Sequence, residues 1–204
     1  MFFHPLRLIK RIIYAVLFLA VVFGVINYQA LMKQAEYYFY SKYPKAEVIR
    51  TILEKPSREE GIPVETRLII PKINVNVPVI EVENSQESTI QKGLENGVVH
   101  YPGTANSGEV GNYFILGHSS DYIWRKGDYK DIFALLDKLE TNDEIKVYYQ
   151  GQEYLYRVID KIIVSENEVQ VLASTPEPTI SLMTCWPVGT PLKRLIVKGR
   201  LVTE

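Results

Sequence analysis

Residues 144–159 read Glu144-Ile-Lys-Val-Tyr-Tyr-Gln-Gly-Gln-Glu-Tyr-Leu-Tyr-Arg-Val-Ile159, two runs of β-branched and aromatic residues around a short polar segment. Such runs are typical of β-strands, and a few residues that include Gly between them favour a hairpin. The turn is expected within Tyr148 to Gln152. The sequence therefore predicts two neighbouring antiparallel strands in this part of the chain.

The same pattern recurs on both sides of this hairpin. Further runs, separated by Pro, Gly and Asn, occupy residues 67–71, 75–80, 112–116, 179–184 and 194–198. Helical periodicity is clear only at 131–139, and a shorter helix is expected at 88–94. Short strands with so little helix predict a mostly β fold, namely a closed or nearly closed eight-stranded β-barrel with one or two short helices.

Composition limits the class of protein. The chain has 204 residues, enough for one domain and an appendage. Hydrophobic residues make up 47% and charged residues 23%, which excludes a disordered chain and a polytopic membrane protein. The formal net charge of -1 offers no basic excess for a phosphate backbone, so no nucleic-acid partner is expected. One cysteine excludes an intramolecular disulfide framework and a zinc site of several thiolates.

An uncharged apolar segment occupies residues 12–32, close to the ~20 residues that a transmembrane helix needs. Arg7, Lys10 and Arg11 precede it, so the positive-inside rule places residues 1–11 in the cytoplasm and the rest of the chain outside. A cleaved signal peptide is the alternative, but it would have a shorter apolar core and an A-x-A-like site. We therefore expect a single-pass anchor preceding the barrel.

The segment at 33–66 separates the predicted anchor from the predicted barrel at 67–204. It contains Pro44, Pro56 and Pro63, which interrupt helices, and we expect an extracytoplasmic tether with a helical stretch at 46–53. Aromatic residues gather near its start, at 37–40 and 43. They fit either the headgroup layer of a membrane or the end of a continued helix.

Cys185 is expected at the end of a predicted strand. An unpaired cysteine outside the membrane is either buried and inert or a nucleophile in use. A nucleophile needs a base and a group that stabilises oxyanion charge. His118 follows the predicted strand at 112–116 and is the stronger candidate base, with His100 as the fallback. Arg194 opens the last strand and would reach the same rim if the two strands are neighbours.

These residues resemble the signature of the sortase family, in which a T-L-x-T-C strand is preceded by a G-H pair and followed by an arginine on the next strand. The chain carries Leu182-Met-Thr-Cys185, Gly117-His118 and Arg194. Ser181 stands where the family has Thr and keeps the hydroxyl. Residues 68–79 and 97–105 are also similar to the family, and the resemblance covers about 67–202.

The resemblance implies a cysteine transpeptidase that needs no cofactor. Cys185 would attack a Leu-Pro-X-Thr-Gly-like C-terminal sorting signal of a surface protein and form a thioester. His118 would protonate the leaving amine, and Arg194 would bind the oxyanion or the substrate backbone. An amine of a peptidoglycan precursor or of a pilin lysine would then accept the protein. Substrates and enzyme would meet at the cytoplasmic membrane.

The resemblance also indicates residues that would bind the substrate. Thr184 would assist through its hydroxyl or its backbone N–H. The loop at 165–178, between the sixth and seventh strands, would set specificity. Its apolar residues fit either a pocket for the sorting signal or a turn of helix packed on the barrel; they are Val169, Val171, Leu172 and Ala173.

Several alternatives stay open. Trp186-Pro187 and Thr190-Pro191 resemble sortase classes D and E more than class A. Scattered acidic residues show no spacing typical of a calcium cage, so no metal site is expected. The protonation state of the Cys185–His118 pair is undecided. The alternative function is a non-catalytic, membrane-anchored barrel that binds a surface peptide or glycan through a remnant site.

Overall fold

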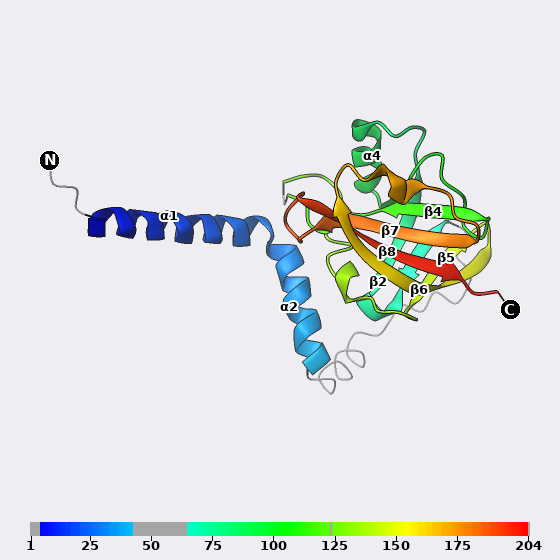
Figure 1. Cartoon of the computed structure of the whole chain (residues 1–204), viewed down its shortest axis with the longest axis horizontal. Helices are drawn as coiled ribbons and strands as arrows, with labels where there is room; N and C mark the ends of the chain where they lie inside the picture. Colours follow the sequence, from blue (N-terminus) through cyan, green and yellow to red (C-terminus); the bar gives the residue numbers. More distant parts are fainter. Residues whose placement is uncertain (1–4, 43–64, 123, 204) are drawn as a thin grey trace.

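The computed structural model describes residues 5–122 and 124–203 except for 43–64. Its main body is a closed barrel with the strand order β1-β2-β3-β4-β7-β8-β6-β5 (Figure 1). The predicted eight-stranded barrel is thereby confirmed. The strands are β1 (Arg67–Ile70), β2 (Val75–Glu81), β3 (Val98–His100), β4 (Gly111–Leu116), β5 (Glu144–Tyr149), β6 (Gln152–Ser165), β7 (Pro178–Trp186) and β8 (Lys193–Leu201).

The predicted hairpin joins β5 to β6, with Tyr149 opposite Gln152. Gln150 and Gly151 lie between them with φ of 50° and 74°. Positive φ at both central residues gives a tight turn whose twist matches that of the flanking strands. β5 also pairs with β1, and this pairing closes the barrel.

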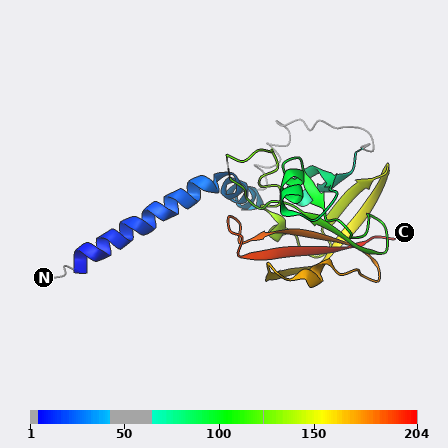
Figure 2. The same ribbon diagram turned by 90° about the horizontal axis from the view of Figure 1, so that it is seen from above.

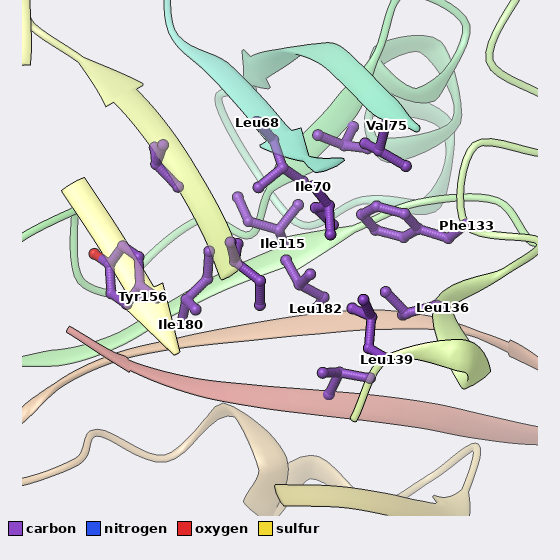
Figure 3. Packing of buried hydrophobic residues seen from close by; sticks show 14 of the residues in the cluster. Leu68, Ile70, Val75, Ile115, Phe133, Leu136, Leu139, Tyr156, Ile180 and Leu182 are labelled. Atoms are coloured by element: carbon purple, nitrogen blue, oxygen red, sulfur yellow. The ribbon is translucent and has the colours of Figure 1, made fainter. Parts of the chain in front are cut away.

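The barrel is filled by a hydrophobic core to which all eight strands contribute side chains (Figure 3). β4 is buried along its whole length, and it pairs in parallel with β7, which is buried over most of its length. Their inward residues, such as Ile115 and Leu182, belong to this core. Outward residues, such as Phe114, join a second cluster beneath the helix α4 (Glu87–Leu94). Burial on both faces makes these two strands a rigid support for side chains at their ends.

The helix expected at 88–94 is confirmed as α4, but the one expected at 131–139 is wrong. That segment forms turns and a short 3-10 helix, η2 (Leu136–Lys138). Phe133, Leu136 and Leu139 are buried in the core, as Figure 3 shows. Their spacing of three residues places all three on one side of a tight, irregular segment that packs into the barrel. Tertiary packing therefore overrides the α-helical periodicity.

Among the described residues that precede the barrel there are two helices, α1 (Pro5–Ile26) and α2 (Tyr28–Lys42), with Asn27 between them. Leu8–Ile26 is long and apolar enough to cross a membrane, and it is the one such helix among the described residues. The apolar helix thus begins and ends earlier than the expected 12–32 segment. α2 turns away from the axis of α1 and lies beside the barrel (Figures 1 and 2). The helical stretch expected at 46–53 lies outside the described residues.

Candidate active site

The β7–β8 pair brings Cys185 and Arg194 together. The two residues lie directly opposite each other in this antiparallel ladder. Directly opposed residues project from the same face of a sheet with Cβ atoms about 4.5–5.5 Å apart. Inward residues of β7 alternate with outward ones, and Leu182 is inward, so Cys185 faces outward. The condition set by the sequence, that the two strands be neighbours, is met.

His118 reaches the same place from the other side of β7. The parallel register of β4 and β7 ends with Leu116 beside Met183, and the Gly117 N–H donates to the Met183 carbonyl at 3.0 Å. Continued by two residues, this register brings His118 level with Cys185. The chain thus places a thiol on the middle strand, with an imidazole and a guanidinium on its two neighbours.

Thr184 connects the two strands that carry the thiol and the imidazole. Its buried hydroxyl donates to the Gly117 carbonyl at 2.8 Å. Gly117 itself has no room for a side chain, because a Cβ there would lie 2.4 Å from the Phe133 ring. Phe133 donates its N–H to the His118 carbonyl at 2.9 Å. The backbone at His118 is therefore held from both sides, and the Thr184 hydroxyl is committed to that support.

Arg194 is held in place by oxygen atoms around it. Its Nη1 donates to the Pro191 carbonyl at 2.8 Å and to the Lys193 carbonyl at 3.1 Å. Its Nη2 lies 3.6 Å from Glu166 Oε2. Glu166 immediately follows β6, whose last residue pairs with Lys193. These contacts fix the direction of the guanidinium at the Cys185 end of the barrel.

Electrostatics favour the neutral forms of both reactive groups. Burial raises the pKa of the Cys185 thiol above its ordinary value of 9.0; Arg194 opposes this effect and Asp121 adds to it. Burial lowers the pKa of His118 below its ordinary 6.5; Asp121 opposes this effect and Arg125 adds to it. The resting pair at pH 7 is therefore a thiol and a neutral imidazole, and the charged pair is a minor species.

Sequence reasoning missed Asp121 and Arg125. Asp121 Oδ2 lies 3.7 Å from His118 Nε2, and Asp121 Oδ1 lies 3.5 Å from Arg125 Nε. Arg125 also donates to Gln91 Oε1 of α4 at 3.2 Å. A carboxylate three residues after a candidate base in a loop was the available signal. Its contact with the imidazole depends on a loop conformation that sequence spacing does not determine.

His100, the fallback base, makes its hydrogen bonds with residues outside the Cys185 site. Its Nδ1 lies 2.8 Å from Glu81 Oε2, and its Nε2 lies 3.0 Å from Thr104 Oγ1 and 3.1 Å from the Ala105 carbonyl. It is buried beside the Tyr113 ring. Because both ring nitrogens have partners within the barrel wall, His100 stabilises the turn that follows β3.

The predicted specificity loop has the expected bounds, since β6 ends at Ser165 and β7 begins at Pro178. Within it, Val169–Leu172 forms the 3-10 turn η3. Val171 and Leu172 pack on the second hydrophobic cluster, and Asn112 Nδ2 donates to the Val171 carbonyl at 2.9 Å. Val169 and Ala173 are exposed. The interpretation as a packed helical turn therefore describes half of the set, and two residues are left facing solvent.

In the part of the chain that the structure describes, no group of three or more His, Cys, Asp or Glu side chains could hold a metal ion.

Comparison with known proteins matches the sortase domain family to residues 68–202. The chain belongs to the sortase family. Sortase D of Bacillus subtilis (strain 168) is 29% identical over 140 residues, which cover 67% of this chain and 63% of that protein. Sortase SrtE1 of Streptomyces coelicolor is 30% identical over 155 residues, covering 67% and 40%. The chain thus matches less than two thirds of the length of either relative.

Solved sortase structures share the fold. A Clostridium perfringens Sortase D5 transpeptidase is similar with a TM-score of 0.55 and 29% identity, covering 87% of this chain and 98% of that one. A lid mutant of Corynebacterium diphtheriae Sortase A gives a TM-score of 0.57 and 28% identity, covering 73% and 75%. Sortase A of Bacillus anthracis is also 29% identical, so identity does not separate the sortase classes.

Proposed function

We propose that this sortase is a membrane-anchored cysteine transpeptidase with Cys185 as nucleophile, His118 as general acid and base, and Arg194 as the oxyanion-binding group. The observation that carries the proposal is the arrangement on three adjacent strands: Arg194 opposite Cys185 in register, and His118 level with Cys185 on the parallel strand. This is the set that acyl transfer through a thioester requires.

In the first half-reaction, the Cys185 sulfur bonds to the carbonyl carbon of the Thr–Gly bond in a Leu-Pro-X-Thr-Gly-like signal. The oxyanion of the tetrahedral intermediate lies against the Arg194 guanidinium. The C–N bond then breaks, and His118 gives its proton to the leaving amine. A thioester between Cys185 and the surface protein remains.

In the second half-reaction, an amine of a peptidoglycan precursor or a pilin attacks the thioester. His118 takes the proton of the attacking amine, and Cys185 leaves as the thiolate and is reprotonated. The minor population of thiolate and imidazolium is the reactive form, because the thiolate is the nucleophile. A cysteine with a raised pKa is protected from oxidation while it waits for substrate.

The anchor is proposed to run through the apolar helix, with residues 1–11 in the cytoplasm and the barrel outside. Arg7, Lys10 and Arg11 precede the uncharged segment at 12–32, and the first charges after it are the mixed pair Lys33 and Glu36, which supports this orientation. Residues 33–66 would act as the connection to the barrel. Confinement to the membrane would raise the effective concentration of substrates that are held in the same membrane.

The proposal also covers the residues that contact the substrate and the sortase class to which the chain is assigned. Val169 and Ala173 would contact the sorting signal, which their exposure supports, while Val171 and Leu172 hold η3 on the barrel. Thr184 acts on the substrate through its backbone N–H, because its hydroxyl is already bonded. The Trp186-Pro187 pair favours class D or E.

The test is acyl-enzyme capture with the full-length protein. A library of sorting peptides is mixed with candidate amines, and mass spectrometry follows the products and a hydroxylamine-releasable adduct on Cys185. We expect the adduct and a ligated product, and we expect neither with Cys185→Ala. A Cys185→Ala protein that cleaves at the parent rate, or a wild-type protein with no adduct for any peptide, would favour the non-catalytic binding barrel instead.

A further inference from the structure

The exposed face of α2 is apolar, which is the reverse of an ordinary surface helix. Its exposed large residues recur at the spacing of one helical face, and their exposed fractions range from 37% to 70%. They are Tyr28, Leu31, Met32, Tyr38 and Phe39. A helix on a soluble domain normally turns its apolar stripe inward and its polar residues outward. A contiguous apolar face left outside normally marks an interaction surface.

The inner face of α2 combines polar and apolar residues, and it is occupied by the barrel. Lys33 Nζ lies 2.9 Å from Asp131 Oδ1, and Gln34 Nε2 donates to the Ala134 carbonyl at 3.2 Å. Ala30 is 1% exposed, and Tyr37 packs against the barrel core. Because these contacts set the rotation of the helix about its axis, the apolar face must point away from the barrel.

The outer face continues directly from the apolar helix α1. Only Asn27 separates them, and it is bonded on both sides: its Nδ2 donates to the Phe23 carbonyl at 3.0 Å, and Ser120 Oγ donates to its Oδ1 at 2.6 Å. Gly189 lies against the same turn, since a Cβ there would be 2.9 Å from the Phe23 ring. The last turn of α1 therefore touches the loops that follow His118 and Cys185.

The loop after His118 adds an exposed aromatic pair to this region. Tyr122 and Trp124 stack at 4.7 Å with an interplanar angle of 14°, and Trp124 is 67% exposed. The Arg125 guanidinium lies 5.6 Å from the Tyr122 ring centroid. Exposed Trp and Tyr beside a cation are the composition of a membrane–water interface. Figures 1 and 2 place the β7–β8 turn at the end of the barrel nearest to α1.

We propose that the outer face of α2 and Trp124 form an interfacial platform that lies in the headgroup layer of the bilayer and holds the Cys185 rim at the membrane surface. The occupant of the apolar face is therefore lipid. In this arrangement α1 runs into the hydrocarbon core, and α2 lies along the interface across the axis of α1 (Figure 1). The barrel then lies on the water side of α2.

The platform would decide which substrates the site meets. A rim at headgroup level lies close to sorting signals and acceptor amines that are themselves attached to the membrane, and it stays open to free peptides. The inference rests on the proposed anchoring through α1, and it adds where the active site stands relative to the bilayer.

The first experiment places a tryptophan on each face of α2 in the full-length protein. In a Trp124→Tyr, Trp186→Phe background, which keeps an interfacial aromatic residue at position 124, Tyr38→Trp reports on the outer face and Gln34→Trp on the face against the barrel. Each protein is reconstituted in phosphatidylcholine and phosphatidylglycerol vesicles with brominated acyl chains. We expect emission from position 38 to be quenched and emission from position 34 to be retained. Near-ultraviolet circular dichroism confirms that both variants are folded.

The possible results separate the platform from the anchor. If position 38 is unquenched while the protein resists extraction from the vesicles by carbonate, the platform is overturned and the anchor stands. If the protein is extracted, the anchoring itself fails. If position 38 is shielded by a second copy, seen as a crosslinked dimer through α2, lipid is the wrong occupant and the proposal is overturned.

The second experiment compares substrates. Leu31→Glu with Tyr38→Glu should lower cleavage of a vesicle-tethered sorting peptide roughly tenfold, because tethering can raise effective concentration by about 10² to 10⁴. Cleavage of the free peptide should not change. Val110→Glu is the matched control, since Val110 is 69% exposed and precedes β4 at the end opposite the site. Equal activity of all proteins on the tethered peptide would overturn the proposal.

Discussion

The two sides of the candidate site are built differently. On one side, Cys185 and Arg194 are fixed by the backbone register of an antiparallel pair of nine-residue strands. On the other side, His118 lies beyond the last residue of β4 and is positioned by contacts of the Thr184 hydroxyl, the Phe133 N–H and the Asp121 carboxylate. The first side resists change because a whole ladder would have to slip. The second side depends on a few bonds, so single substitutions there should adjust the site without destroying the fold.

The largest effect tests the register. Exchanging the first two residues of β8, as Lys193→Arg with Arg194→Lys, keeps the charge and moves the guanidinium to the other face of the sheet. We expect a loss of roughly 10² to 10³ in kcat, the usual effect of removing an oxyanion donor. Lys193→Arg alone is the matched control and should stay near wild type. Full activity in the exchanged protein would mean that the cross-strand pairing does not position the arginine.

The next effect tests the bond that holds the histidine side. Thr184→Val removes the hydroxyl that binds the Gly117 carbonyl and should cost about 1–3 kcal/mol of unfolding free energy, because a buried acceptor loses its partner. It should also lower kcat/KM. Thr179→Val is the control, since Thr179 lies on the same strand and donates to the Glu177 carbonyl at 3.0 Å, far from the site. It should lower stability in urea unfolding and leave kcat/KM unchanged. Equal kinetic losses in both variants would refute a positioning role for Thr184.

A smaller effect tests the charges around the imidazole through the pH dependence of kcat/KM. The profile should be a broad bell, with its acid limb below the ordinary pKa of histidine and its alkaline limb above that of cysteine. In Asp121→Asn the imidazolium loses a favourable partner and the thiolate loses a repulsive one, so both limbs should move to lower pH. Arg125→Gln should move only the acid limb, and to higher pH, because Arg125 lowers the pKa of His118.

Alkylation of Cys185 by iodoacetamide checks the same charges without substrate. The rate should keep rising above pH 9.0, the ordinary pKa of the thiol, because burial raises that pKa. A rate that reaches its plateau near neutral pH would instead indicate a stable thiolate–imidazolium pair.

The smallest effect tests the contact between the histidine loop and the helix junction. Ser120→Ala removes the hydrogen bond to Asn27, which contributes about 0.5–1.5 kcal/mol. We expect a small decrease in thermal stability and unchanged cleavage of a free peptide. A large loss of free-peptide activity would mean that the N-terminal helices shape the histidine side directly.

The sequence predicts the β5–β6 hairpin correctly and the segment at 131–139 wrongly, and the two cases have different physical causes. Gln150 and Gly151 mark a turn by local conformational preference, and the strands on either side follow from alternation of residue type, so the hairpin is predictable. The segment at 131–139 has the same local signals as a helix. Its apolar residues are instead buried inside the closed barrel, and this burial is available only once the other strands are in place.

Local chemistry in the sequence by itself determined the strands, the apolar helix, the position of Cys185 at a strand end and the motif that carries the family resemblance. Only the tertiary structure decided that β7 lies between β4 and β8, that Asp121 faces His118, and that α2 turns Lys33 and Gln34 to the barrel and its large apolar residues outward. The physical reason is range. Turns and strand periodicity depend on neighbouring residues, whereas parallel pairing and the rotation of a docked helix depend on contacts between residues 67 to 100 positions apart, as in Thr184 with Gly117 and Gln34 with Ala134. Asp121 and His118 are only three residues apart, but their contact depends on a loop conformation that spacing does not determine.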